Sequence, residues 1–228
     1  MSATLTLALE GSTYQGSVAL IRETQVIAEK TLNNDGGGAV AGRGEQLLPA
    51  VAECIEAAGV RKEDITRIIC GAGPGRFTSL RIAGSAAKGL ATGLGADLYA
   101  VSSLLLTVTG ARPSLRAGEY LSVLEAMRGD WFVAHVTLDA DGIVSEQGSA
   151  RIVSSAELDA IARADPRLQL IGPGQVIDAH PHARGIAPVL ARIAAMGPVD
   201  LASWEPDYGR LPEAQVRREA ASRTSPAR

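Results

Sequence analysis

Aromatic side chains are scarce in this sequence, at 4% of its 228 residues. Such a chain is not suited to stacking the bases of a single-stranded nucleic acid on aromatic platforms. Positive charge is not in excess either, because 22 lysines and arginines face 25 aspartates and glutamates, for a formal net charge of −3. The composition therefore does not predict a strongly basic nucleic-acid binder.

Cysteine and long apolar runs are also rare. Cys54 and Cys70 are the only cysteines, and each lies in an apolar run, which predicts buried thiols in a reducing compartment and not a disulfide framework. No run approaches the ~18 apolar residues typical of a membrane helix. The first residues lack a charged region followed by an apolar stretch, so no signal peptide is expected. We expect a cytoplasmic protein without membrane contact.

Familiar catalytic motifs are missing. The sequence has no His-Glu-x-x-His, no Cys-x-x-Cys and no Gly-x-Ser-x-Gly segment, so neither zinc nor serine hydrolysis is supported. His180 and His182 are two residues apart and lack the helical spacing of a metal-binding pair. His135 alternates with apolar residues, which favours a structural or surface role.

Glycine, in contrast, is abundant at 25 residues, about 11% against a typical ~7%. The run of strands and helices predicted along the chain divides it into a first lobe at 1–101, a second lobe at 102–216 and a frayed basic tail at 217–228. Hydrophobic periodicity predicts strands at 5–9, 17–21, 25–32, 65–70, 98–101, 120–126, 131–138, 142–153 and 168–171. It predicts helices at 45–58, 78–94, 104–109, 155–164, 186–196 and 201–204, the fourth opened by a capping box at Ser154 and Glu157. Both lobes mix strands and helices in a related order, which favours a duplicated α/β architecture.

The first hairpin carries a carboxylate, a glycine and two hydroxyls in the segment Glu10-Gly11-Ser12-Thr13. Backbone N–H groups can approach a phosphate closely at a glycine, and a carboxylate can hold a metal ion through water. A plain hairpin made of turn-forming residues explains the same segment. The residues alone leave both interpretations open.

A second glycine-rich turn, Gly73-Pro74-Gly75, joins a buried strand to the helix at 78–94. The unpaired N–H groups at the start of that helix favour an anion, although a tight structural turn is an equally good interpretation. Within the helix, Gly84 and Gly89 each cost roughly 1 kcal/mol relative to alanine. A helix face that carries glycines allows close packing, either against the sheet of the same chain or against a helix of a partner.

Five segments then occur in a telling order. They are Leu7–Thr13, Glu45–Pro49, Gly73–Ile82 followed by Lys88–Ala91, Glu125–Phe132 and Pro206–Ala214. In this order the chain resembles the TsaB (YeaZ) family of bacterial tRNA threonylcarbamoyladenosine biosynthesis proteins, which is related to the glycoprotease-like proteins. The resemblance covers nearly the whole chain, and its most specific part is the Gly-Pro-Gly segment.

The resemblance implies an actin-like ATPase (ASKHA) fold, an α/β architecture of two lobes, each with a mixed sheet flanked by helices. It implies a non-catalytic scaffold that docks and supports a TsaD-like catalytic paralogue in making threonylcarbamoyladenosine in tRNA. A TsaE-like ATPase is the other implied partner, and tRNA is contacted indirectly. Alone, the chain is expected to be a homodimer. No tightly bound cofactor is expected, although the resemblance leaves room for ATP at the partner interface.

The resemblance also assigns residues, none of them catalytic and none a metal ligand. The expected partner or dimer interface consists of Arg76, Phe77, Thr78, Arg81, Gly84, Ser85, Lys88 and Gly89. The expected vestigial phosphate site consists of Glu10, Gly11, Ser12 and Thr13. The sequence departs from the family pattern at Glu10, Arg43, Arg76 and Ser79, which disfavours ATP chemistry of its own. The alternatives are a stand-alone ATPase or kinase of the actin-like superfamily and, with less support, a metalloprotease.

Overall fold

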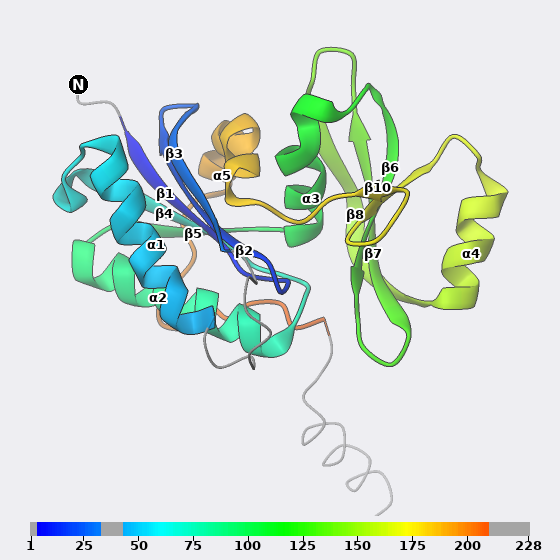
Figure 1. Cartoon of the computed structure of the whole chain (residues 1–228), viewed down its shortest axis with the longest axis horizontal. Coiled ribbons are helices and arrows are strands. Elements are labelled where there is room, and N and C mark those ends of the chain that lie inside the picture. Colours follow the sequence, from blue (N-terminus) through cyan, green and yellow to red (C-terminus); the bar gives the residue numbers. More distant parts are fainter. Residues whose placement is uncertain (1–3, 33–42, 210–228) are drawn as a thin grey trace, which may run out of the picture.

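Two five-stranded mixed sheets form the framework of this computed structural model, which describes residues 4–32 and 43–209 (Figure 1). The first sheet has the order β3-β2-β1-β4-β5 and the second has the order β10-β9-β6-β7-β8. The strands of the first sheet are β1 (Leu5–Glu10), β2 (Gly16–Arg22), β3 (Gln25–Leu32), β4 (Ile65–Gly71) and β5 (Asp97–Val101). Those of the second are β6 (Gly118–Glu125), β7 (Asp130–Leu138), β8 (Val144–Ser154), β9 (Gln169–Gly172) and β10 (Ile177–Asp178).

The two sheets repeat one topology. In the first, β1, β2 and β3 form an antiparallel meander, while β4 and β5 continue parallel to β1. In the second, β6, β7 and β8 form the meander, while β9 and β10 continue parallel to β6. The predicted two-lobe α/β architecture and its duplication are confirmed.

The helices repeat less closely. Helix α1 (Arg43–Ala58) precedes β4 as α4 (Ser155–Ala164) precedes β9, and α2 (Phe77–Leu94) joins β4 to β5. A short turn replaces α2 between β9 and β10. The capping box at Ser154 is confirmed, because its hydroxyl accepts the Glu157 N–H while the Glu157 carboxylate accepts the Ser154 N–H.

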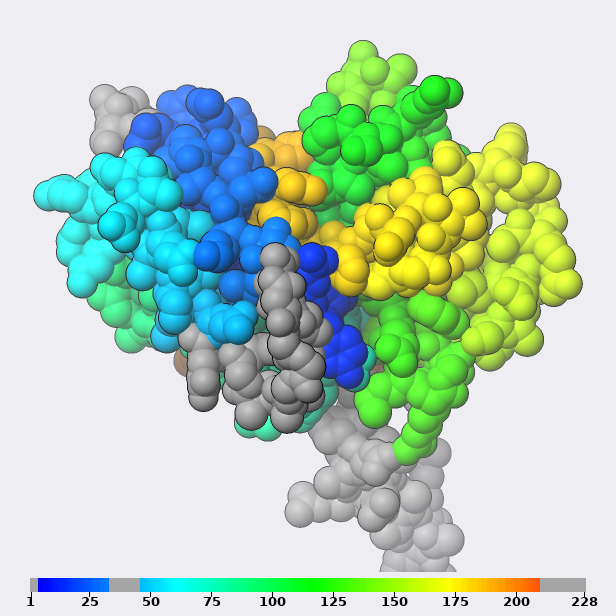
Figure 2. Space-filling model, in the orientation of Figure 1, coloured from blue at the N-terminus to red at the C-terminus, as the bar shows by residue number. Residues whose placement is uncertain are grey.

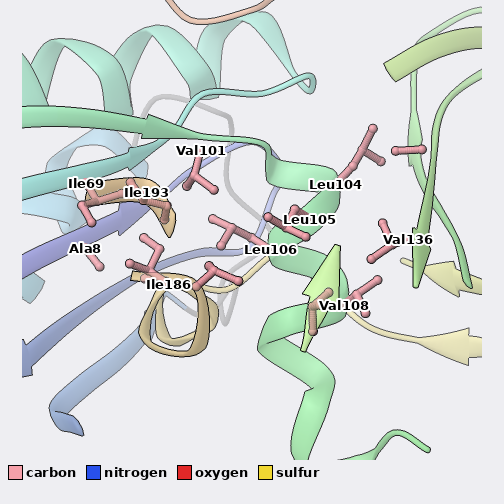
Figure 3. Close-up of a cluster of buried hydrophobic side chains, with 14 of the residues drawn as sticks. Ala8, Ile69, Val101, Leu104, Leu105, Leu106, Val108, Val136, Ile186 and Ile193 are labelled. Carbon is pink, nitrogen blue, oxygen red and sulfur yellow. The ribbon is translucent and has the colours of Figure 1, made fainter. Parts of the chain in front are cut away.

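The last helix of each half lies on the sheet of the other half. Helix α3 (Ser103–Ala111) follows the first sheet but contacts β6, β7, β8 and β9. The 3₁₀ helix η4 (Ala183–Val189) and helix α5 (Leu190–Met196) follow the second sheet but contact strands of the first. In Figure 3, leucines of α3 lie between Ala8 and Ile193 on one side and Val136 on the other, within one buried cluster. The two sheets therefore share a hydrophobic core.

Residues 199–209, which we call the C-terminal strap, also return to the first lobe. The Val199 N–H donates to the Leu98 carbonyl at 2.8 Å, and the Asp207 N–H donates to the Ala72 carbonyl at 2.7 Å. The first sheet ends at Val101 and the second begins at Gly118, whereas segments within residues 183–209 return to pack against the first sheet. The tail at 217–228, and residues 210–214 of the last motif, lie outside the described residues.

Several local predictions need correction. The helix expected at 186–196 is η4 followed by α5, because Pro188 has no N–H to continue an α-helical ladder. Residues 201–203 form turns where a helix was expected, and the two-residue β10 was not predicted. Helix α1 begins at Arg43, two residues before the expected start at 45, and contains Pro49 in its interior. The cysteines are free and buried, as predicted, and burial raises the pKa of both thiols.

Candidate functional site

Glu10, at the end of β1, turns its carboxyl into the protein and is fully buried. One carboxyl oxygen accepts the Ser12 N–H at 2.5 Å, and the other accepts the Ser103 hydroxyl at 3.0 Å. A Cβ added at Gly71 would lie 1.8 Å from Glu10 Oε2, so only glycine leaves room for this side chain. Burial raises the pKa of Glu10, and its hydrogen bonds to Ser12 and Ser103 offset part of that effect.

The rest of the hairpin is occupied by neighbouring backbone. The Arg76 N–H donates to the Ser12 carbonyl at 2.8 Å, and a Cβ at Gly75 would lie 2.4 Å from the same oxygen. A Cβ at Gly11 would lie 2.8 Å from the Cβ of Ala83 on α2. Thr13 closes its own turn, since its hydroxyl accepts the Gln15 N–H at 3.2 Å. The two glycine-rich motifs therefore pack directly against each other.

The Arg76 side chain covers the junction of these two loops. Its guanidinium lies 3.4 Å from the centre of the Tyr14 ring and 3.4 Å from the carboxylate of Glu125, at the end of β6. The contact with Glu125 joins the first lobe to the second. Burial lowers the pKa of Arg76, with Glu125 acting against it.

These residues do not fit the metal-bound nucleotide phosphate that the actin-like fold implies. A phosphate site needs N–H groups that are free to reach the ligand, but the Ser12 N–H is taken by Glu10. Glu10 itself is buried, so it presents no carboxylate to a metal ion. In the part of the chain that the structure describes, no three His, Cys, Asp or Glu side chains are grouped so that they could hold a metal ion.

The expected interface residues lie along α2, but not on one face. Phe77, Thr78, Arg81, Ser85 and Gly89 are exposed. A Cβ added at Gly89 would meet nothing within 4 Å.

Arg76 precedes α2 and contacts Tyr14 and Glu125, whereas Gly84 and Lys88 are occupied by the C-terminal strap. Gly84 is buried beneath Pro206, whose Cγ would lie 2.8 Å from an added Cβ. Lys88 is half-buried and donates to the Trp204 carbonyl at 2.9 Å. Tyr208 packs against Phe77 with 4.7 Å between ring centres. Sequence reasoning included residues 206–208 in a family motif but gave them no role, because their contacts are distant in sequence.

Comparison with known proteins shows which family the chain belongs to. The family model described as TsaD, tRNA N6-adenosine threonylcarbamoyltransferase, matches residues 21–164, which is more than half of the chain. The chain belongs to the TsaD family. Within that family it is similar to TsaB (YeaZ), as the five motifs predicted.

Two TsaB proteins carry that similarity in sequence. The chain is 32% identical over 99 residues to the tRNA threonylcarbamoyladenosine biosynthesis protein TsaB of Escherichia coli, covering 43% of each protein. It is 35% identical over 98 residues to TsaB of Bacillus subtilis, covering 43% of this chain and 41% of that one. The matched part thus spans less than half the length of these relatives.

A solved structure extends the likeness over most of the chain. YeaZ from Pseudomonas aeruginosa shares 25% identity with a TM-score of 0.71, covering 89% of this chain and 98% of that one. The predicted actin-like fold of two lobes agrees with this neighbour and with the TsaD family assignment. No helix among the described residues is both long and apolar enough to cross a membrane.

Proposed function

We propose that this chain is a non-catalytic subunit of the assembly that makes threonylcarbamoyladenosine in tRNA, where it docks and supports a TsaD-like catalytic paralogue. Membership of the TsaD family and similarity to TsaB support the pathway. The observation that carries the non-catalytic role is the closed hairpin, in which the buried Glu10 carboxyl occupies the Ser12 N–H. A TsaE-like ATPase and tRNA join through the assembled complex.

The docking surface in this proposal is the exposed stripe of α2, formed by Thr78, Arg81, Ser85 and Gly89. These positions recur every three or four residues and so lie on one side of the helix. Because Gly89 has no side chain and no neighbour, a partner helix can approach the α2 backbone closely. The same stripe forms the homodimer contact when the chain is alone.

Leucine in place of Gly89 or Ser85 is expected to reduce capture of a coexpressed TsaD-like paralogue at least tenfold, on the order of a 1.4 kcal/mol loss of binding. A bulky side chain there separates the two helices. The free subunit should fold normally, because leucine has the higher helix propensity and Gly89 has open space around it. Affinity capture from coexpressing cells and thermal melting of each purified variant measure the two effects.

Ala160→Leu, on the exposed surface of α4, is the matched control and should leave capture unchanged. Gly84→Leu is unsuitable as a docking variant, since it would push Pro206 away. If Gly89→Leu and Ser85→Leu both captured the paralogue as well as the unsubstituted chain does, the stripe would not be the docking surface.

Titration calorimetry separates this proposal from a stand-alone ATPase or kinase. With magnesium and ATP, the isolated chain is expected to show no saturable heat below about 1 mM, an affinity of roughly −4 kcal/mol. Micromolar binding by the isolated chain would instead favour an enzyme in its own right. Binding that appears only with the catalytic paralogue present would assign ATP to the partner interface.

A further inference from the structure

A cleft of about 870 Å³ opens between the lobes near the C-terminal end of α3. Figure 2 shows the surface hollowed here, between the blue strands of the first lobe and the green residues after α3, with orange residues beneath. Its polar lining comes from both lobes and includes Gln15, Thr31, Arg116, Asp178, His180 and His182. The volume falls within the range of small-molecule sites, which often form between domains.

His182 determines the direction of the hydrogen bond that it forms with Thr31 in the wall of the cleft. The residue is 7% exposed, and its Nδ1 accepts the Arg184 N–H at 3.1 Å. The ring proton of the neutral imidazole is therefore on Nε2, which donates to the Thr31 hydroxyl at 3.0 Å. Because Thr31 accepts this bond, its own hydroxyl hydrogen is available to a ligand.

Two further groups in the cleft lack partners of their own. Nδ1 of His180 is buried without a hydrogen-bond partner among the described residues. Arg116 is exposed and makes no ion pair within residues 4–32 and 43–209. Because Nδ1 of His180 has no exposed surface, Arg116 is the one of these two groups that a ligand in the cleft can reach.

The other charged groups of the lining are already engaged. Its one carboxylate, Asp178, already accepts the Gly174 N–H at 2.9 Å. Arg184 is engaged as well, because its Nε donates to the Gly110 carbonyl at 2.9 Å. Arg116 is thus the cation left to attract a ligand within the described lining.

We propose that this cleft binds a small molecule bearing a phosphate or carboxylate group, with Arg116 pairing with the anion and the Thr31 hydroxyl donating to it. The site is distinct from the closed hairpin. Glu10 contacts Ser103 at the first turn of α3, whereas the cleft lies at Gly110 and Ala111, about 10 Å along the helix at 1.5 Å per residue. A ligand held here contacts both lobes, so its binding stabilises the folded chain.

Thermal melting of the whole chain in potassium phosphate or potassium citrate, against potassium chloride at equal ionic strength, tests the proposal. At least one of the two probes is expected to raise the melting temperature of the unsubstituted chain by about 3 °C more than that of Arg116→Gln, since ligands that bind only the native state stabilise it, whereas the general stabilisation by these salts acts on both. An effect of phosphate would indicate a ligand with a phosphate group, and an effect of citrate would indicate a ligand with a carboxylate group. Titration calorimetry with the effective probe then gives its affinity.

Arg116→Gln is expected to weaken that affinity about tenfold, while melting unchanged in chloride. Arg151→Gln, an exposed arginine on β8, is the matched control and should bind like the unsubstituted chain. Equal binding by Arg116→Gln and the unsubstituted chain would overturn the proposal. So would the absence of any stabilisation by either probe.

Discussion

Replacing Gly71 with alanine is expected to lower the free energy of unfolding by about 4 kcal/mol. The added Cβ would lie 1.8 Å from the Glu10 carboxyl oxygen and 3.1 Å from the Ser103 hydroxyl. Glu10 has no free space to move into, because it is fully buried and bonded to Ser12 and Ser103. The substitution therefore breaks a buried hydrogen-bond network or shifts β4 away from β1. Urea unfolding measures the change.

A double-mutant cycle with Glu10→Asp identifies the cause. Aspartate is one methylene shorter and draws the carboxyl back from the new methyl group, so the two substitutions should be coupled by at least about 1.5 kcal/mol. Gly89→Ala is the matched control and should stabilise α2 by up to about 1 kcal/mol, because nothing lies near that position. Simple additivity of Gly71→Ala and Glu10→Asp would show that Glu10 does not cause the damage.

Stability should also fall by about 3 kcal/mol between pH 6.5 and pH 4 because of His182 alone. Burial, with the nearby charge of Arg184, lowers the pKa of His182 to about 4, and Glu29 acts weakly in the opposite direction. The unfolded chain binds this proton near pH 6.5, and the folded chain only near pH 4. Stability is therefore complete above pH 6.5 and decreases as the pH falls through that window.

Urea unfolding at several pH values isolates this effect. The stability difference between the unsubstituted chain and His182→Gln should shrink by about 3 kcal/mol from pH 6.5 to pH 4, because glutamine has no proton to gain. Lowered carboxylate pKa values, such as that of Asp165, act at lower pH and cancel in the difference. His135→Gln, at an exposed ion pair with Glu119, is the control. A constant difference for His182→Gln would contradict the prediction.

Much of the fold could be predicted because its signals are local. Alternating leucines identify β1, the capping box identifies the start of α4, and the repeated order of strands indicated the duplication. The two-residue strand β10 is too short for a periodic signal. The turn at 201–203 was mistaken for a helix because Asp200 closes a single turn there: its carboxylate accepts the Ala202 N–H and the Ser203 hydroxyl, and its carbonyl accepts the Trp204 N–H.

The site was predictable in its residue types but not in its contacts. Glu10 was expected at a phosphate hairpin, yet its side chain turns inward, because Gly71 leaves the space and Ser103 provides a hydrogen bond. Both residues are far from Glu10 in sequence. Gly84 and Gly89 looked alike as small residues of one helix, but Pro206 covers the first and leaves the second open. Which side of a helix faces its own chain depends on segments that meet only after folding.

Helices α3, η4 and α5 each pack on the sheet of the other half of the chain. This packing determines how the chain would behave if it were divided into two pieces. A fragment ending after α3 would keep α1 and α2 but lack η4 and α5, which also pack on its sheet, and a fragment beginning at β6 would lack α3. Each would expose an apolar surface that the other is shaped to cover. Neither half is therefore expected to fold fully on its own. If the backbone were cut between α3 and β6, the two pieces would form a heterodimer and not two independent domains.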